Sequence, residues 1–403
     1  MSEIQDGASQ YAHLPDELLA KMLDAVPVTV DKMNAMFDVQ GQPIDEGVAS
    51  LRAKGMIRTL GAGDVSNSLV AVDGSNIVDR MTGTDILLSV AVGVEGLSQD
   101  DTVAWGSDKS QYDQWQTVLP HGDANARLSQ GIMFLMELSV LARSGHEIRI
   151  MDGNHFTAIL KINSMLSAKE DNAGADYADA LRDFLKQHYD KVIPDIPSII
   201  SAALGNENIL AMVKYSSSRD VISAYLDPKT IHIDDKTLFT LGLRGGEYLA
   251  PLSVGQSADE RKSIWDELHI WCNLDIPERD QLNEALEKAI APIKTRTSSA
   301  DGGTHKQSDL FYTYFKPFEG GPAYRLEIKR GVAEDQARLE RCLRSIKAQI
   351  VFPEIREPYP QFLADLMAKS VSGGLRSIKE AIRLSQDIKL DDDRINLLFD
   401  YRT

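Results

Sequence analysis

Leu69-Val-Ala-Val-Asp-Gly-Ser75 is the stretch of sequence that decides the fold. Its apolar residues form a run of strand length, which ends at Asp73 directly before a glycine. A second run, Glu147-Ile-Arg-Ile-Met-Asp152, closes in the same way, because Gly153 follows its aspartate. Asp-Gly after an apolar run is typical of a strand that stops at a turn. We therefore expect two buried strands, each ending in an aspartate.

Outward from this stretch, apolar runs alternate with segments of helical periodicity. Residues 85–94 and 209–214 have the apolar character of central strands, and residues 123–143 carry apolar residues at helical spacing. Further strands are expected near 237–241, 310–316 and 323–329, and helices near 155–167, 175–190, 258–271, 278–291, 333–350, 360–372 and 374–388. Interleaved strands and helices with some hairpin neighbours predict an α/β fold with a mixed sheet.

The composition narrows the class of protein. The 403 residues include 43 Lys+Arg and 60 Asp+Glu, a formal charge of −17, which disfavours a protein that coats nucleic acid by general basicity. Two cysteines, Cys272 and Cys342, exclude a disulfide scaffold and fit a reducing cytoplasm. The sequence opens without a signal-peptide pattern, and no apolar run approaches the roughly 18 residues of a membrane span. The expected location is the cytoplasm.

Three carboxylates stand where a ligand could bind. Asp73 and Asp152 end their strands, and in open α/β sheets the carboxyl ends of strands form the ligand site. Glu137 lies within Met133-Phe-Leu-Met-Glu-Leu138, where burial of a charge is costly unless a cation pairs with it. Carboxylates suit Mg²⁺ and Mn²⁺, the ions that assist phosphodiester displacement. Each Asp-Gly could instead be a simple turn, and Glu137 could lie at a helix edge, but the set together predicts a metal site.

These motifs resemble those of the NurA nucleases, DNA-end-processing enzymes that work with a HerA-type hexameric ATPase. The resemblance spans about 69–370 and rests on Ala71-Val-Asp-Gly-Ser75, Glu137, Ile150-Met-Asp-Gly153, Met212-Val-Lys-Tyr-Ser216, Ala323-Tyr-Arg-Leu-Glu-Ile328 and Glu357-Pro-Tyr-Pro360. It implies an RNase-H-like mixed β-sheet core flanked by helices. It also implies phosphodiester hydrolysis that depends on Mn²⁺ (or Mg²⁺), and a homodimer that encircles DNA.

One position departs from that family's pattern. The family usually carries a His eight residues after the tyrosine, where this chain has Met367, and a thioether binds hard cations poorly. Asp365 and Lys369 are not obvious substitutes, and Met367 could equally be a core residue of the 360–371 helix. The residues expected to act without that histidine are Asp73, Glu137 and Asp152 as metal ligands and catalytic residues, with Lys214 at the phosphate.

The expected DNA contacts lie in the C-terminal third. Residues 310–390 contain 14 Lys+Arg against 10 Asp+Glu, so this segment is net positive in an acidic protein. It could line a DNA path, with Arg325 and Lys329 as contacts, or it could be an ordinary solvated basic face. Tyr359 could stack on a base or bond a phosphate, or it could pack in the interior.

We expect three regions along the chain. A helical N-terminal segment occupies 1–60, a NurA-like nuclease domain 61–390, and a C-terminal tail 391–403, with helical insertions at about 155–205 and 255–308. The polar stretch 295–308 is expected to be a loop. Helical spacing over 14–37 makes this part the expected contact with a HerA-like ATPase.

Two functions from different classes remain open. The first is a deoxyribonuclease acting at DNA ends, in end processing or in defence against foreign DNA. The second is a catalytically weak adaptor that guides DNA on a HerA-like motor, which Met367 and the acidic total favour. A metallophosphatase is disfavoured, because Gly153-Asn-His155 is similar to one of its motifs but the companion Asp-x-His is absent. His155 is therefore expected to begin a helix or to support the site from behind.

Overall fold

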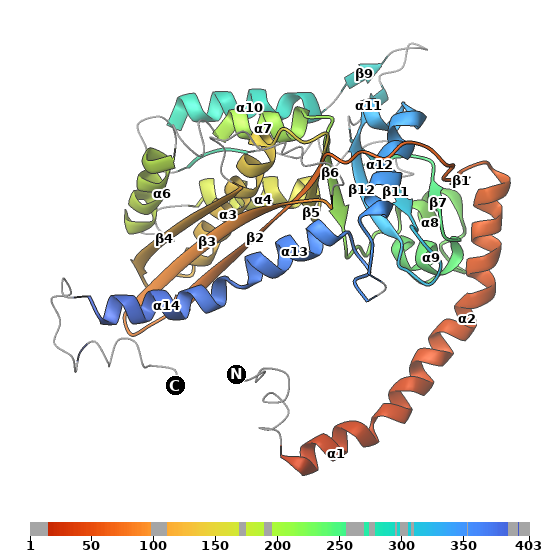
Figure 1. Cartoon of the computed structure of the whole chain (residues 1–403), viewed down its shortest axis with the longest axis horizontal. Helices are drawn as coiled ribbons and strands as arrows, with labels where there is room; N and C mark the ends of the chain where they lie inside the picture. The colour runs from red at the N-terminus through yellow and green to blue at the C-terminus, as the bar shows by residue number, and fades with distance from the viewer. Residues whose placement is uncertain are drawn as a thin grey trace.

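A mixed sheet built around β2 (Leu69–Arg80) forms the centre of the structure (Figure 1). The chain is described by a computed structural model at residues 15–97, 111–168, 175–188, 196–254, 270–273, 279–294, 296–298, 305–307, 310–352, 354–385 and 394. The strand order is β1-β7-β11-β12-β6-β5-β2-β3-β4, with β8 paired to β11. The other strands of this sheet are β1 (Ile57–Thr59), β3 (Thr84–Glu95), β4 (Tyr112–Pro120), β5 (Ile148–Asp152), β6 (Ile209–Val213), β7 (Glu247–Leu249), β8 (Leu252–Ser253), β11 (Leu310–Phe315) and β12 (Tyr324–Lys329).

The pairing directions explain why the sheet is mixed. β2, β3 and β4 form an antiparallel meander, whereas β5 runs parallel to β2 and β6 runs parallel to β5. β12 then joins β6 in the antiparallel direction. This arrangement, flanked by helices, confirms the expected α/β class with a mixed sheet.

Both faces of β2 are covered, which accounts for its continuous apolar run. Val70 and Val72 lie in the core that α3 (Asn125–Arg143) completes, whereas Leu69 and Ala71 lie in a core with α12 (Gln336–Ala348). Successive side chains of a strand point to opposite faces, so a strand covered on both sides must be apolar throughout. α13 (Tyr359–Lys369) and α14 (Val371–Arg383) cross β2 and β3 on the side opposite α3 (Figure 1).

The remaining helices pack around this centre or extend from it. They are α1 (Asp16–Asp24), α2 (Val26–Ala53), α4 (His155–Leu166), α6 (Ala175–His188), α7 (Ile196–Gly205), α8 (Asp220–Tyr225), α9 (Asp235–Gly242), α10 (Arg279–Lys294) and α11 (Arg330–Ala333). α4 and α7 pack on α3, and α10 packs on α7. Among the described residues, no helix combines the length and the apolar composition that crossing a membrane requires.

Three expectations about local structure were wrong. The strand expected to stop at Asp73 runs on to Arg80, because the segment after Gly74 pairs with β3 through Arg80↔Asp85. The strand expected near 237–241 is helix α9, whose N-cap Asp234 accepts a hydrogen bond from the Thr237 amide at 2.8 Å. In the stretch expected to be a loop, β9 (Arg296–Ser298) and β10 (His305–Gln307) pair as a short antiparallel ladder. Most of the helix expected at 258–271 lies outside the described residues.

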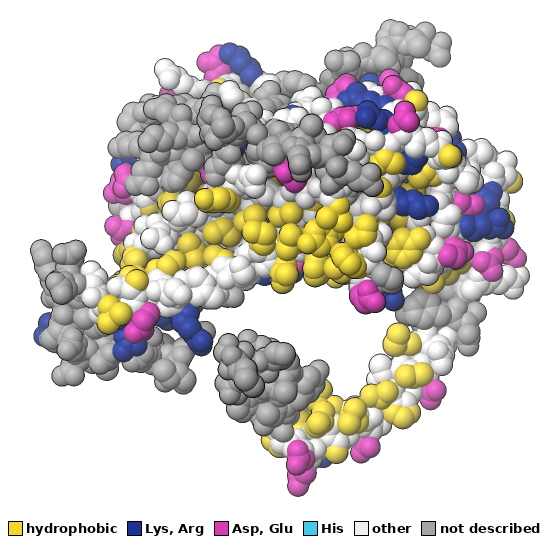
Figure 2. Space-filling model, viewed as in Figure 1, with side chains coloured by type: hydrophobic (Ala, Val, Ile, Leu, Met, Phe, Trp, Pro, Cys, Tyr) yellow, Lys and Arg dark blue, Asp and Glu magenta, His cyan; other side chains and the backbone are white. Residues whose placement is uncertain are grey.

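The N-terminal helices α1 and α2 leave the body of the molecule as an arm (Figure 1). Pro27 lies in the first turn of α2, where its fixed backbone angle suits the start of a helix. Only the C-terminal part of α2 is buried, at residues such as Val48 and Leu51. The outer part of the arm exposes a set of apolar side chains: Leu18, Met22, Leu23, Val26, Val28, Val30 and Met33. Figure 2 shows apolar side chains at the surface of this arm, away from the body of the molecule.

Candidate metal centre

Two aspartates lie side by side because their strands are parallel neighbours. Val72 pairs with Met151 in register, so Asp73 and Asp152 follow at the same level of β2 and β5. Each aspartate makes the same hydrogen bond with the glycine that follows it. The Gly74 and Gly153 amides donate to the Oδ1 of the preceding aspartate at 2.9 Å. Repetition of Asp-Gly on adjacent parallel strands therefore builds a pair of oriented carboxylates.

A third aspartate reaches the pair from α13. One carboxylate oxygen each of Asp73, Asp152 and Asp365 lies within 4.8 Å of the others. Asp365 belongs to the face of α13 that meets the sheet, together with the buried Gln361, Ala364 and Ala368 at helical spacing. The sequence reading that set Asp365 aside was therefore wrong.

Met367 lies off that face and is 46 % exposed. It is too exposed to be a core residue, so that reading of the position was wrong, whereas its place at the family's histidine position stays a prediction. Counting eight residues from the tyrosine selects the wrong side of the helix, whereas the step of four from Gln361 to Asp365 keeps to the side that contacts β2.

Glu137 approaches Asp73 from α3, on the other face of the sheet. Its side chain is buried and lies against Gly74, where a Cβ would collide with Glu137 Oε1 and come within 2.8 Å of Met133 Cγ. Burial, and then the charges of Asp73 and Asp152, raise the pKa of Glu137 well above its ordinary value. Glu137 thus lies near Asp73 and Asp152 but outside the set of three mutually close carboxylates, and its position requires a glycine at position 74.

The carboxylates carry more negative charge than their surroundings neutralise. Burial and the neighbouring charge of Asp152 raise the pKa of Asp73 to about 7. Burial would raise the pKa of Asp365 as well, but its hydrogen bond from Lys369 and the charge of Lys214 lower it overall. A raised carboxyl pKa is the response expected where a cation would be favourable. Hard oxygen ligands clustered in this way fit Mg²⁺ or Mn²⁺.

Lys214 lies at the edge of the cluster, directly after β6. Its Nζ is 3.2 Å from Asp152 Oδ2 and 2.8 Å from Glu357 Oε2. Burial would lower the pKa of Lys214, but the two carboxylates more than offset this and raise it, so the amine stays charged. Lys214 therefore lies against one of the clustered carboxylates, and its predicted role at the phosphate stays a prediction.

Two of the predicted DNA contacts are in the interior. Arg325 is 7 % exposed and Lys329 is 2 % exposed. The Arg325 guanidinium lies over the Tyr312 ring, 4.3 Å from its centroid, and 3.5 Å from Glu327. Both side chains are therefore withdrawn from a DNA surface, and the geometry gives their prediction as contacts no support.

His155 supports this interior network. It begins α4, as expected, and its backbone amide donates to Glu327 Oε2 at 3.2 Å, while its Nδ1 lies 3.3 Å from the same oxygen. Burial lowers the pKa of His155, although Glu327 opposes the shift.

Two tyrosines that could contact DNA bases differ in their exposure. Tyr215 is 91 % exposed, and Lys236 Nζ lies 5.2 Å from its ring centroid. Tyr359, a predicted DNA contact, is half-buried with its ring 6.0 Å from that of Phe352. Tyr215 follows Lys214 directly in the sequence, but nothing in the pattern indicated that its ring would be so exposed.

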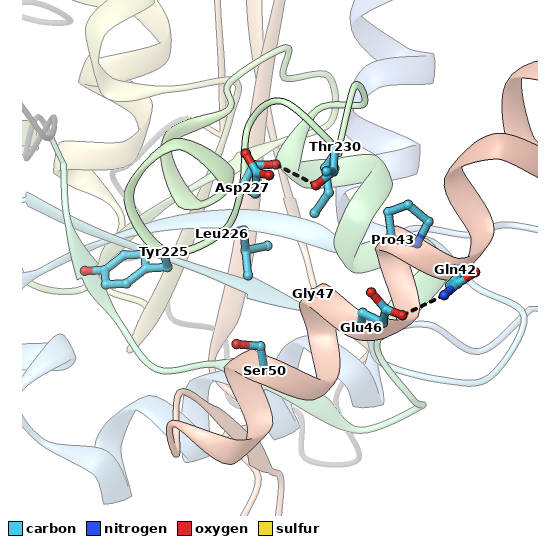
Figure 3. Close-up of a pocket in the computed structure, with 10 residues that line it drawn as sticks. Gln42, Pro43, Glu46, Gly47, Ser50, Tyr225, Leu226, Asp227 and Thr230 are labelled. Carbon is cyan, nitrogen blue, oxygen red and sulfur yellow. Dashed lines mark hydrogen bonds between the residues drawn. The ribbon is translucent and has the colours of Figure 1, made fainter.

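A cavity of about 580 Å³ lies elsewhere, between α2 and the segment joining α8 to α9 (Figure 3). Glu46, which accepts a hydrogen bond from Gln42 at 2.8 Å, and Asp227 bring its carboxylates. None of the clustered aspartates lines it. The carboxylate cluster is therefore the candidate functional site. The cavity is a separate feature at the base of the arm.

Comparison with known proteins shows a fold similar to that of solved NurA structures. No family model and no curated protein matches the sequence. Among solved structures, the NurA nuclease from Sulfolobus solfataricus matches 92 % of this chain and 99 % of its own, with a TM-score of 0.54 at 14 % identity. A structure of NurA bound to dAMP and manganese covers 91 % of this chain and 99 % of its own, with a TM-score of 0.49 at 13 % identity. At such identities the likeness establishes the fold, and the activity must be argued from the site.

Proposed function

We propose that this protein is a metal-dependent deoxyribonuclease that hydrolyses phosphodiester bonds. The observation that carries the proposal is the cluster of Asp73, Asp152 and Asp365, with Glu137 beside it and Lys214 at its edge. Four acidic groups from four elements, with one lysine from the bend after β6, are a costly arrangement for stability alone. They fit a site that acts on an anionic ester.

Each side chain has a task in this proposal. The three aspartates, with Glu137 behind Asp73, would hold Mn²⁺ or Mg²⁺, which when bound lowers the pKa of a water nucleophile and neutralises phosphate charge. Lys214, kept charged by Asp152 and Glu357, would contact a non-bridging phosphate oxygen. Tyr215 and Tyr359 would stack on bases near the reacting phosphate, since aromatic rings bind unpaired bases without regard to sequence.

The adaptor alternative has lost its main support. It rested on the absence of a ligand at Met367, and Asp365 supplies a carboxylate from the same helix. The overall charge of −17 still means that DNA must be held by local features or by enclosure in an assembly.

We also propose a homodimer and a HerA-like hexameric ATPase as partners. The exposed apolar side chains of α1 and the first half of α2 support a docking role for this arm, because a protein surface rarely leaves such a series uncovered. DNA end processing, or defence against foreign DNA, is the corresponding biological role.

The proposal is tested with the full chain and end-labelled linear DNA, duplex and single-stranded. Mn²⁺ should start cleavage, and a chelator should stop it. Asp73→Asn keeps the shape of the side chain but removes a charge, so the rate should fall by more than the roughly 10–100-fold that loss of an outer partner of a metal ligand costs. Cleavage by Asp73→Asn at the wild-type rate would exclude the site. If the chain cleaves DNA only when a HerA-like ATPase is added, that partner activates the nuclease.

A further inference from the structure

Gln361 is a buried amide whose contacts lead into the carboxylate cluster. It lies in the first turn of α13 and is 1 % exposed. Its Nε2 donates a hydrogen bond to Asp152 Oδ1 at 3.0 Å. Its Oε1 is buried and has no hydrogen-bond partner. Buried polar atoms without partners are rare, and one beside a reactive site calls for a reason.

The contact of Gln361 fixes how Asp152 is oriented. Asp152 Oδ1 accepts two hydrogen bonds, from Gln361 and from the Gly153 amide. Asp152 Oδ2 is thereby turned toward Lys214, 3.2 Å away. Because Gln361 and Asp365 are four residues apart, one face of α13 supplies a carboxylate to the cluster and also orients a carboxylate that β5 supplies.

We propose that Gln361 is a positioning residue of the metal centre. Its amide nitrogen holds Asp152 in the orientation that binds the cation, and its carbonyl oxygen accepts a hydrogen bond from a water molecule at the site. This inference rests on the proposed function. Outer partners of metal ligands orient those ligands, and their loss typically lowers metal affinity about 10–100-fold.

The test compares Mn²⁺ binding to the full chain by calorimetry, without DNA. Gln361→Met keeps the length of the side chain but removes both polar atoms, and we expect Mn²⁺ affinity to fall about 10–100-fold. Gln361→Asn keeps an amide that is one methylene too short to reach Asp152, and it should weaken binding in the same direction. The matched control is Gln40→Met, since Gln40 is 3 % exposed and accepts from the His232 amide far from the cluster. That control should keep wild-type affinity.

A second readout separates positioning from simple packing. For Gln361→Met we expect kcat to fall while KM for DNA stays near wild type, with a melting temperature no lower than that of Gln40→Met. Wild-type Mn²⁺ affinity in both Gln361 variants would overturn the inference and leave the proposed function intact. A wild-type chain that neither binds Mn²⁺ nor cleaves DNA would overturn both.

Discussion

At the scale of single residues, the orientation of α13 determines which of its side chains face the carboxylate cluster. Asp365→Asn should weaken Mn²⁺ binding, because it removes one of three clustered carboxylates. Met367→His, by contrast, should leave Mn²⁺ affinity and the pH–rate profile unchanged and alter stability by no more than about 0.5 kcal/mol, as is usual for exposed positions. Calorimetry and rate measurements from pH 5 to 9 check both variants. A new inflection near the ordinary histidine pKa in Met367→His would contradict this arrangement.

Some residues of the site could be predicted from the sequence and others could not. Asp73 and Asp152 were predictable because each ends an apolar run before glycine, and Glu137 because a carboxylate among methionines and leucines is unusual. Asp365 gave no such signal, since an acidic residue on an amphipathic helix is commonly a solvated one. Its role depends on which side of α13 meets the sheet, and this is set by packing far along the chain.

At the scale of elements, Gly74 lets β2 pass directly beneath α3. A side chain there would overlap Glu137 and Met133, whose positions are fixed by an almost fully buried helix. Gly74→Ala should therefore displace Glu137, lower the free energy of unfolding by about 1–3 kcal/mol as overpacking does, and reduce cleavage. Denaturant titration and nuclease assays measure the two effects.

Gly41→Ala is the matched control for Gly74→Ala, because nothing lies within 4 Å of a Cβ at position 41. Gly41 lies within helix α2, and alanine favours a helix more than glycine does. The substitution is therefore expected to cause no loss of stability. Equal effects of the two substitutions would show that the close contact at Gly74 is unimportant.

Capping explains why one element was mistaken for a strand. Residues 237–241 read Thr-Leu-Phe-Thr-Leu, whose β-branched and aromatic residues favour a strand. Asp234 caps the helix, and the Asp235 carboxylate accepts the amides of Val221 and Ile222 at 2.9 and 3.0 Å. These local and tertiary hydrogen bonds override the strand propensity. The long apolar strands and α3 were predictable because they are buried on all sides and need no such partners.

At the scale of the whole molecule, the carboxylate cluster should make stability depend on pH and metal together. The folded chain keeps a proton on Asp73 up to about pH 7, whereas the unfolded chain loses it near 3.8. The folded state therefore binds more protons between these values, and the contribution of Asp73 to the free energy of unfolding falls as pH rises through them. Glu137 acts in the same direction.

Mn²⁺ should offset that loss. We expect the cation to raise the melting temperature more at pH 8 than at pH 5, because at pH 5 protons compete for the same oxygens. Thermal scans at both pH values, with Mn²⁺ or a chelator, measure the difference. An equal increase at both pH values would place the bound ion away from Asp73.

The arm is the part of the molecule that should be separable from the site. Deleting residues 1–37 removes α1, which has no buried residue, together with the exposed half of α2. The truncated chain should keep Mn²⁺ affinity and lose binding to a HerA-like ATPase, as measured by calorimetry and by co-purification. Loss of Mn²⁺ binding on truncation would mean that the arm supports the fold.

Light scattering of the full chain at micromolar concentration tests the proposed homodimer, and a monomer would contradict that proposal.

The origin of the carboxylates in distant parts of the chain has a consequence for biosynthesis. Asp73 and Asp152 emerge early from the ribosome, whereas Asp365 comes nearly three hundred residues after the first of them. A growing chain therefore carries an incomplete ligand set until α13 has been made and has docked on β2. If the protein cuts DNA as proposed, interrupted translation products that end before α13 are harmless to the genome of the cell that makes them. On that proposal the order of residues along the chain would act as a safeguard, because competence to cleave would arrive only once α13 has been made.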